Sequence, residues 1–156
     1  MSIEEQFTFI EVSNTKEVAK LSAKIVFNKI KENPRIVLGL ATGNTMIPFY
    51  KELVKYYQKG LISFSKVITF NLDEYYPINP EDKSSFRSFM NKNLFERIDI
   101  KQQNINFLNG NVKDFKKECR RYERKIKKVG GIDLQILELK IPDIFITRRT
   151  ILLIRE

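Results

Sequence analysis

The sequence predicts an α/β fold of three layers, in which helices cover both faces of a mostly parallel sheet. Short runs of apolar and branched residues recur at 7–12, 36–41 and 67–71, and stretches with apolar residues at helical spacing fall between them. Strand, helix and strand in this alternation are typical of βαβ units, whose right-handed crossovers make neighbouring strands parallel. We therefore expect Val37 and Val67 to lie on neighbouring strands of one sheet.

Local signals mark the ends of the first two helices. Ser13 or Asn14 can cap the first helix, and Glu17 is placed to complete a capping box. This helix should end just before Pro34, because the residue that precedes a proline avoids the helical conformation. The second helix should stop at Gly60, which can serve as its C-terminal cap.

The remaining elements continue the alternation. In order, we expect a helix at 84–95, a strand at 105–108, a turn at 109–111, a basic helix at 113–128 and a strand at 132–137. Phe115, Tyr122 and Ile126 are spaced to form the buried side of the basic helix. The segment after Leu137 mixes basic residues with branched apolar ones, and we expect it to be irregular or helical and loosely packed.

The charge of the chain restricts its partners. The 156 residues carry a net charge of +9, and the pI is about 9.6. Much of the positive excess lies between Lys113 and Lys128, where it fits the solvated face of a surface helix. A nucleic-acid groove would interleave aromatic residues with the basic ones or belong to a recognisable module, and neither is evident. No apolar run approaches the length of a membrane span, so we expect neither nucleic acid nor a membrane as a partner.

Two residue types restrict the chemistry. Cys119 is the single cysteine, which excludes an intrachain disulfide and suits a reducing cytoplasm. The first residues are acidic where a signal peptide has basic ones, so we expect a cytoplasmic protein. The sequence has no histidine, which excludes a Ser–His or Cys–His nucleophile and the zinc sites that rely on histidine. We expect no metal and no cofactor.

The stretch from Ile36 to Thr45 combines a buried strand with a glycine-containing turn that opens a helix. Backbone amides of such a turn, together with the helix N-terminus, form a site for an anion, and phosphate is the anion we expect. The candidate phosphate-binding residues are Thr42, Gly43, Asn44 and Thr45, since both threonines add hydroxyl donors. The same residues also fit an ordinary turn in which Gly43 supplies a positive φ.

Two consecutive acidic residues, Asp73 and Glu74, follow the strand that contains Val67. In an open parallel sheet, ligands bind beyond the carboxyl ends of the strands, so Thr42, Gly43 and Asp73 should line one pocket. One carboxylate that faces a bound sugar phosphate can move a proton between adjacent carbons. An exposed acidic turn or a helix-capping aspartate would explain the same residues.

Several segments together carry a resemblance to a known family. Leu38–Thr45 has the pattern T-G-x-T, and Val67–Tyr75 contains F-N-x-D-E-Y. Ser88–Met90, Ile105–Asn111 and Gly130–Leu137 follow in order and without large gaps. Over about residues 7–137 the sequence resembles glucosamine-6-phosphate deaminase, of the glucosamine/galactosamine-6-phosphate isomerase family. The two patterns are highly specific in combination.

The resemblance implies a Rossmann-like sheet and a reaction. Glucosamine 6-phosphate and water become fructose 6-phosphate and ammonia, which is a deaminating hydrolysis in amino-sugar catabolism. Asp73 would be the general base that moves a proton between C1 and C2, the turn at 42–45 would hold the sugar phosphate, and Glu74 would be a further substrate-binding residue. The implied partner is a small-molecule sugar phosphate, no cofactor is implied, and intact members of the family should be homo-oligomers.

The resemblance stops after Leu137. The family continues with G-I-G-x-x-G-H-I-x-F-N-E-P, whose histidine helps to open the sugar ring, whereas this sequence has Glu138–Asp143. We therefore interpret residues 1–137 as the N-terminal part of a sugar-phosphate isomerase/deaminase domain and 138–156 as a non-family tail, from a frameshift or a truncation. The sheet should then be incomplete at the C-terminus, and the chain an inactive fragment. The alternatives are a 6-phosphogluconolactonase-like hydrolase and a non-catalytic sugar-phosphate-binding module.

Overall fold

The computed structural model describes residues 7–12, 14–137 and 150–155. Its elements are β1 (Phe7–Val12), α1 (Thr15–Glu32), β2 (Val37–Leu40), the 3-10 helix η1 (Asn44–Met46), α2 (Ile47–Gln58), β3 (Ile68–Asn71), α3 (Phe86–Asn93), the 3-10 helices η2 (Phe95–Arg97) and η3 (Gln102–Asn104), β4 (Ile105–Asn106), α4 (Phe115–Lys128), β5 (Leu134–Gln135) and β6 (Thr150–Arg155). Each helix and strand that the sequence predicts within residues 7–137 is present, and several are shorter than predicted.

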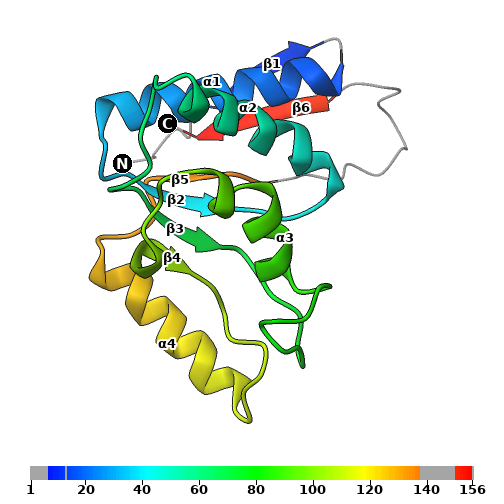
Figure 1. The fold of residues 1–156 in the computed structure, drawn as a ribbon, viewed down its shortest axis with the longest axis vertical. Coiled ribbons are helices and arrows are strands. Elements are labelled where there is room, and N and C mark those ends of the chain that lie inside the picture. The colour runs from blue at the N-terminus through cyan, green and yellow to red at the C-terminus, as the bar shows by residue number, and fades with distance from the viewer. Residues whose placement is uncertain (1–6, 13, 138–149, 156) are drawn as a thin grey trace, which may run out of the picture.

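Four strands form a parallel sheet in the order β4-β3-β2-β5 (Figure 1). Val37 of β2 pairs in register with Ile68 of β3, which confirms that the strands predicted at Val37 and Val67 are neighbours. The chain moves outward from β2 to β3 and β4 and then returns to β5, on the other side of β2. The strand order therefore reverses at β2, and an open α/β sheet binds its ligands at the carboxyl edge beside such a reversal.

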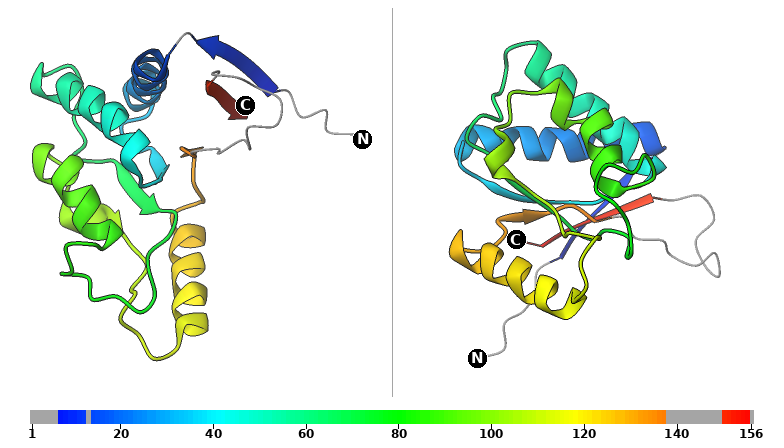
Figure 2. Two further views of the ribbon diagram at one scale, coloured as in Figure 1. Left: turned by 90° about the vertical axis from the view of Figure 1, so that its right-hand side faces the viewer. Right: turned by 60° about the horizontal axis from the view of Figure 1, so that its bottom comes forward.

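This reversal explains how the helices divide between the two faces of the sheet. A right-handed crossover from β2 to β3 puts α2 on one face, and the crossover in the opposite direction, from β4 to β5, puts α4 on the other. Accordingly α1, α2 and α3 lie on one side of the sheet and α4 on the other (Figure 1, Figure 2). The predicted three-layer arrangement with a mostly parallel sheet is confirmed.

The face under α1, α2 and α3 holds the main hydrophobic core. Its largest fully buried side chains are Tyr50, Phe64, Leu38, Leu40, Leu53 and Met90. Burial of a large apolar side chain stabilises the fold by about 1.5–3 kcal/mol, and this cluster is much larger than the one on the opposite face. The strand ends that precede the candidate site therefore rest on the larger of the two cores.

The α4 face has a smaller core around Phe70 and Tyr122, with Ile126 packed against it. The rings of Phe70 and Tyr122 meet edge to face, with their centroids 5.5 Å apart. The predicted burial of Phe115 is wrong, since this residue is 51% exposed. Phe115 is the first residue of α4, and its ring lies 5.6 Å from that of Tyr76, in the loop after β3, instead of over the sheet.

β1 lies outside the parallel sheet, so the part of the predicted βαβ alternation that begins with the strand at 7–12 is wrong. It pairs with β6 in an antiparallel register that runs from Phe7 and Arg155 to Val12 and Thr150, beside α1 (Figure 1). The partner of β1 lies near the other end of the sequence, so the local alternation of strands and helices could not reveal it.

The prediction that the tail is irregular or helical is wrong for residues 150–155, which form β6. This segment, Thr-Ile-Leu-Leu-Ile-Arg, is rich in branched residues that favour extended backbone, and β1 offers it a strand to pair with. Residues 138–149, which belong to the same predicted tail, lie outside the described part of the chain.

The helix starts differ in how they are capped. α1, α3 and α4 each begin with a side chain that accepts a hydrogen bond from their own first turn, namely Asn14, Ser85 and Asp114. Asn14 is one of the two predicted caps of α1, and Gly60, the residue predicted to end α2, lies just past it with a positive φ of 67°. α2 itself has no side-chain cap at Met46.

Candidate functional site

The candidate site lies at the carboxyl ends of β2 and β3. Leu40 and Asn71 are opposite each other in the parallel register, and the Leu72 amide donates to the Leu40 carbonyl at 2.9 Å. The chain then continues into two segments, residues 42–45 after β2 (the Thr42 turn) and residues 72–78 after β3 (the Asp73 loop). Both segments leave the same edge of the sheet, as the sequence predicts. That they line one pocket stays a prediction.

The Thr42 turn is held by its backbone. Gly43 has a φ of 141°, in the region that favours glycine, and its carbonyl accepts from the Met46 amide at 3.0 Å. η1 leads directly into α2, and neither helix start is capped by a side chain. Within the described part of the chain, the side chains of Thr42, Asn44 and Thr45 make no hydrogen bond, so their polar groups are available to a ligand.

Tyr50 holds the strand end that precedes this turn. It is fully buried in α2, and its hydroxyl donates a hydrogen bond to the Ala41 carbonyl. Burial raises the pKa of Tyr50 far above its ordinary value of 10.0, so the hydroxyl remains a neutral donor across the physiological range. The position of the turn relative to α2 is therefore set from the core side.

Asp73 lies two residues beyond β3, at the protein surface. Partial desolvation of its carboxyl raises its pKa above the ordinary value of 3.8, and the negative charge of Glu74 adds to the rise. A raised pKa makes a carboxylate a stronger base. The surroundings of Asp73 thus suit an acid/base role.

Glu74 reaches from the Asp73 loop to the start of α3. Its carboxylate accepts hydrogen bonds from the backbone amides of Phe86 at 2.9 Å and Arg87 at 3.1 Å. The oxygen that faces Phe86 also accepts from the Tyr75 amide at 3.0 Å. Both oxygens are therefore engaged by backbone N–H groups. The prediction that Glu74 contacts the substrate is not tested by these bonds and stays a prediction.

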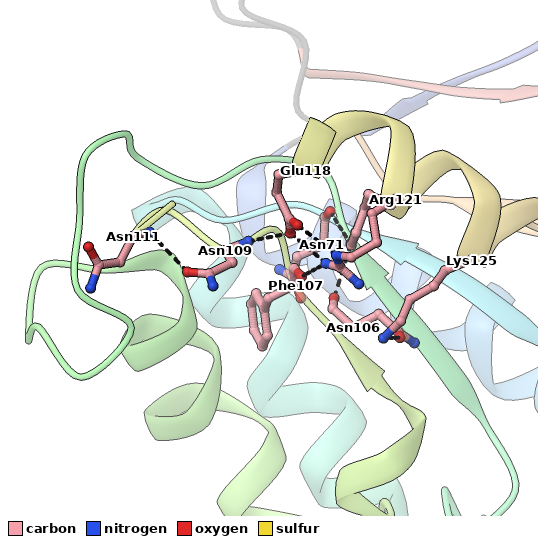
Figure 3. Close-up of polar contacts among 9 residues, drawn as sticks. Asn71, Asn106, Phe107, Asn109, Asn111, Glu118, Arg121 and Lys125 are labelled. Atoms are coloured by element: carbon pink, nitrogen blue, oxygen red, sulfur yellow. Dashed lines mark hydrogen bonds and ion pairs between the residues drawn. The ribbon is translucent and has the colours of Figure 1, made fainter. Parts of the chain in front are cut away.

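Side chains of α4 join the ends of β3 and β4 from the opposite face of the sheet. The Tyr122 hydroxyl lies 2.8 Å from the Asn71 carbonyl and 3.0 Å from the Asn106 carbonyl, so it bridges the two strand ends. The Lys125 ammonium donates to the side-chain oxygen of Asn106 at 3.3 Å (Figure 3). Asn71 directly precedes the Asp73 loop, which therefore starts from a fixed position.

Glu118 of α4 fixes the loop after β4. Its carboxylate accepts from the Asn109 amide at 2.8 Å and from the Arg121 guanidinium, whose Nε lies 2.6 Å away (Figure 3). The Arg121 hydrogen bond is the largest cause that lowers the pKa of Glu118 below its ordinary value of 4.5, and the Asn109 bond acts in the same direction. Glu118 therefore stays charged although it is buried.

Gly110 lets the loops after β3 and β4 approach each other. A Cβ atom at this position would lie 2.3 Å from the Tyr75 carbonyl oxygen, closer than a carbon atom can come. The Gly110 carbonyl accepts from the Ile78 amide at 2.9 Å, which ties the far end of the Asp73 loop. The glycine of the turn predicted at 109–111 is thus needed for packing.

Two cavities adjoin the Asp73 loop on the α4 side. One, of about 210 Å³, lies between the loops after β3 and β4 and the start of α4. The other, of about 270 Å³, lies between α4 and residues of β3 and β5. Neither is lined by Thr42, Gly43 or Asp73. In residues 7–12, 14–137 and 150–155, no group of three His, Cys, Asp or Glu residues is arranged to hold a metal ion, and no helix is long and apolar enough to cross a membrane.

One residue that supports the site, Glu118, and one contact, that of Glu74 with α3, are not predicted from the sequence. Glu118 was grouped with the charges of a solvated helix face, but it is 8% exposed and carries the loop after β4. The signal was present, since an acid within a basic run, three residues before Arg121, is placed for an ion pair on one helix face. The contact of Glu74 with α3 has no local signal, because its partner amides are 12 and 13 positions away.

A parallel sheet whose strand order reverses, with helices on both faces, defines an open α/β domain, a class that binds its ligands at the carboxyl edge of the sheet. Comparison with known proteins identifies the family within this class of domain. The model of the glucosamine-6-phosphate isomerase/6-phosphogluconolactonase family matches residues 11–145, and the chain belongs to this family.

Individual relatives are similar to this chain over most of its length. It is 50% identical over 128 residues to the glucosamine-6-phosphate deaminase of Thermoanaerobacter sp. (strain X514), which covers 82% of this chain and 51% of that protein. It is 46% identical over 132 residues to the enzyme of the same name from Clostridium botulinum (strain Langeland / NCTC 10281 / Type F), which covers 85% and 54%. The chain thus spans about half the length of the curated relatives it matches.

Solved structures agree with this placement. A monomeric glucosamine-6-phosphate deaminase superposes with a TM-score of 0.78 at 38% identity, over 81% of this chain and 52% of that one. The 6-phosphogluconolactonase from Thermotoga maritima superposes with a TM-score of 0.65 at 21% identity, over 81% and 56%, and shows the shared fold alone.

These findings correct one expectation and leave another open. The relatives are named deaminases and do not support the expected hydrolase class, although 6-phosphogluconolactonase neighbours are hydrolases. The family match runs to residue 145, past Leu137. The division into residues 1–137 and a tail at 138–156 stays a prediction.

Proposed function

We propose that this chain carries the phosphate-binding turn and the proton-transferring base of a glucosamine-6-phosphate deaminase. The observation that carries the proposal is the position of Asp73, a carboxyl with a raised pKa, on a strand end adjacent to the Thr42 turn. Identity of 46–50% to deaminases supports this reaction over the hydrolysis of a sugar-phosphate lactone and over a non-catalytic binding module.

The residues divide the work between binding and chemistry. The backbone amides of Gly43 and Asn44 and the hydroxyls of Thr42 and Thr45 bind the phosphate group. Asp73 removes the proton from C2 of the opened amino sugar and delivers it to C1. The product of this transfer is an imine at C2, which water cleaves to the ketose phosphate and ammonia.

Ring opening must precede this proton transfer. The family resemblance assigns ring opening to a histidine segment, and this sequence contains no histidine. We therefore propose that the 156-residue chain transfers protons only on an open-chain substrate and does not deaminate the closed sugar at an appreciable rate.

The proposed deaminase function also implies a binding partner and a cellular compartment. The partner is a small sugar phosphate and neither nucleic acid nor a membrane. The basic residues of α4, such as Lys116, Arg120 and Lys127, lie on its exposed side, and we interpret them as a solvated helix face. The compartment is the cytoplasm, which suits the single cysteine, Cys119. Assembly of intact family members into homo-oligomers is part of the proposal, although the similar solved deaminase is described as monomeric.

A deuterium-exchange assay tests the proton transfer without ring opening. Fructose 6-phosphate has an open keto form, and with ammonium it supplies the C2 imine from which the base removes a C1 proton in the reverse reaction. In D2O with both compounds, the chain should exchange C1 protons, as followed by proton NMR. Asp73→Asn should abolish the exchange, and Glu81→Gln, a matched change at an exposed acid of the following segment, should leave it intact. Equal exchange by Asp73→Asn and the unaltered chain would refute the proposal.

A further inference from the structure

The start of α3 takes its hydrogen-bond acceptors from two places. The first amides of a helix have no partner within the helix and need an acceptor from elsewhere. The Ser88 amide is served locally by the Ser85 side chain at 3.0 Å. The Phe86 and Arg87 amides are served by Glu74, which belongs to the Asp73 loop. One carboxylate thus joins that loop to a helix packed in the main core.

The contact is a strong one for its size. A carboxylate at a helix N-terminus is favoured by the partial positive charge of the helix end, and hydrogen bonds to an ionised acceptor are stronger than neutral ones. Two amides on separate oxygens fix both the place and the rotation of the Glu74 side chain. The amides of the first turn of α3 therefore hold the Glu74 carboxylate in one position and orientation.

Further contacts, on both sides of Asp73, restrict the backbone of the Asp73 loop. The rings of Tyr75 and Phe86 lie with their centroids 4.4 Å apart, which adds an apolar contact between the loop and α3. The Tyr75 carbonyl is in close approach to Gly110. Leu72, at the other end, is bonded to β2 through its amide. Asp73 lies between these fixed points, and its direction depends on the backbone at residue 74.

We propose that Glu74 is a positioning residue, whose carboxylate attaches the Asp73 loop to the first turn of α3 and so sets the direction of the Asp73 carboxyl. This role deepens the proposed function, since it rests on Asp73 being the base. It gives Glu74 an indirect part in substrate turnover. The negative charge of Glu74 also acts on Asp73, whose pKa it helps to raise.

Two variants separate positioning from simple stabilisation of α3. Glu74→Gln keeps the shape and one acceptor oxygen but removes the charge and the second acceptor. Ser85→Ala, the matched control, removes an acceptor from the same first turn without touching the Asp73 loop. Amide hydrogen exchange of residues 72–75 and 86–88 and the NMR titration of the Asp73 carboxyl are measured in both variants and in the unaltered chain.

Glu74→Gln should speed exchange at Phe86 or Arg87 and in residues 72–75 by about tenfold, the effect of losing one hydrogen bond. It should also lower the pKa of Asp73 toward its ordinary value. Ser85→Ala should speed exchange at Ser88 and leave both the amide exchange of residues 72–75 and the pKa of Asp73 unchanged. Equal effects of the two variants on Asp73, or a change in its titration without faster exchange at 72–75, would overturn the proposal. Since no substrate is used, these results are independent of the deuterium assay above.

Discussion

The two segments at the edge of the sheet differ in how they are held. The Asp73 loop is bonded to β2 through Leu72, to α3 through Glu74 and to the loop after β4 through Ile78. The Thr42 turn has a backbone hydrogen bond at Gly43. The side chains of Thr42, Asn44 and Thr45 form no hydrogen bond with the described residues. A base must be aimed to within a fraction of an ångström, whereas phosphate is bound by amides that the helix already directs. The difference is consistent with the roles proposed above, in which the Asp73 loop supplies the base and the Thr42 turn binds the phosphate.

Substitutions in the two segments should therefore have different effects. Changes around the Asp73 loop should lower the stability of the fold, because they break contacts that exist without a ligand. Changes in the Thr42 turn should weaken ligand binding and leave stability nearly unaltered.

The largest expected effect concerns catalysis, since a fixed base alone should not be sufficient for deamination of the closed sugar. Ammonia release from glucosamine 6-phosphate by the 156-residue chain should be slower than that of a full-length relative by at least about 10²–10⁴-fold, the usual contribution of one positioned acid/base. The sequence contains no histidine to open the ring. Turnover close to that of the relative, and lost in Asp73→Asn, would mean that the machinery for ring opening lies in residues assigned no role above.

Gly110→Ala should be the most damaging single change near the Asp73 loop. The added carbon would meet the Tyr75 carbonyl at 2.3 Å, so the two loops must separate. Overpacking of this kind costs about 1–3 kcal/mol in the free energy of unfolding, measured by urea denaturation. Gly60→Ala is the control, since a Cβ there meets nothing within 4 Å and only its φ of +67° is unfavourable. A smaller loss at Gly110 than at Gly60 would contradict the close approach.

Glu118→Gln should cost about 1 kcal/mol at neutral pH, since one charge-assisted acceptor for Asn109 and Arg121 is weakened. The folded-state pKa of Glu118 is lowered, so its contribution is complete above the ordinary value of 4.5 and is lost as the pH falls through the lower folded value. Urea denaturation at several pH values should show the two proteins converging in stability below pH 4.5. A constant difference between them at all pH values would count against this role.

Thr45→Val should have the smallest effect on the fold. The side chain is exposed and makes no hydrogen bond to the described residues, so stability should change by less than about 0.5 kcal/mol. The loss of its hydroxyl should instead weaken binding of glucosamine 6-phosphate, measured by calorimetry. Unchanged binding together with clear destabilisation would reverse the roles assigned to the two segments.

Much of the parallel sheet and of the helix boundaries was predictable from local sequence patterns. The strands at Val37 and Val67 follow from apolar runs, and the positions of Thr42 and Asp73 follow because parallel strands end at one edge. The cap at Asn14 and the stop at Gly60 are chemical signals within a few residues. Patterns of this kind depend on near neighbours in the sequence, and these predictions hold.

The contacts that fix the site depend on residues far apart in the sequence. Glu74 bonds to amides at 86 and 87, and Gly110 is needed because of Tyr75. The pairing of β1 with β6 joins the two ends of the chain, and no local pattern selects that partner. Phe115 has helical spacing that suits burial, but its place at the start of α4 leaves it 51% exposed. Tertiary position decides in each of these cases.

The central claim is that the Thr42 turn and the Asp73 loop form one sugar-phosphate site. Two-dimensional amide NMR of the 156-residue chain, titrated with glucosamine 6-phosphate, tests it most directly. The amides of Gly43, Thr45 and Asp73 should shift together with one dissociation constant, and glucosamine, which lacks the phosphate, should leave Gly43 and Thr45 unmoved. Shifts confined to one of the two segments, or to the basic residues of α4, would contradict the claim.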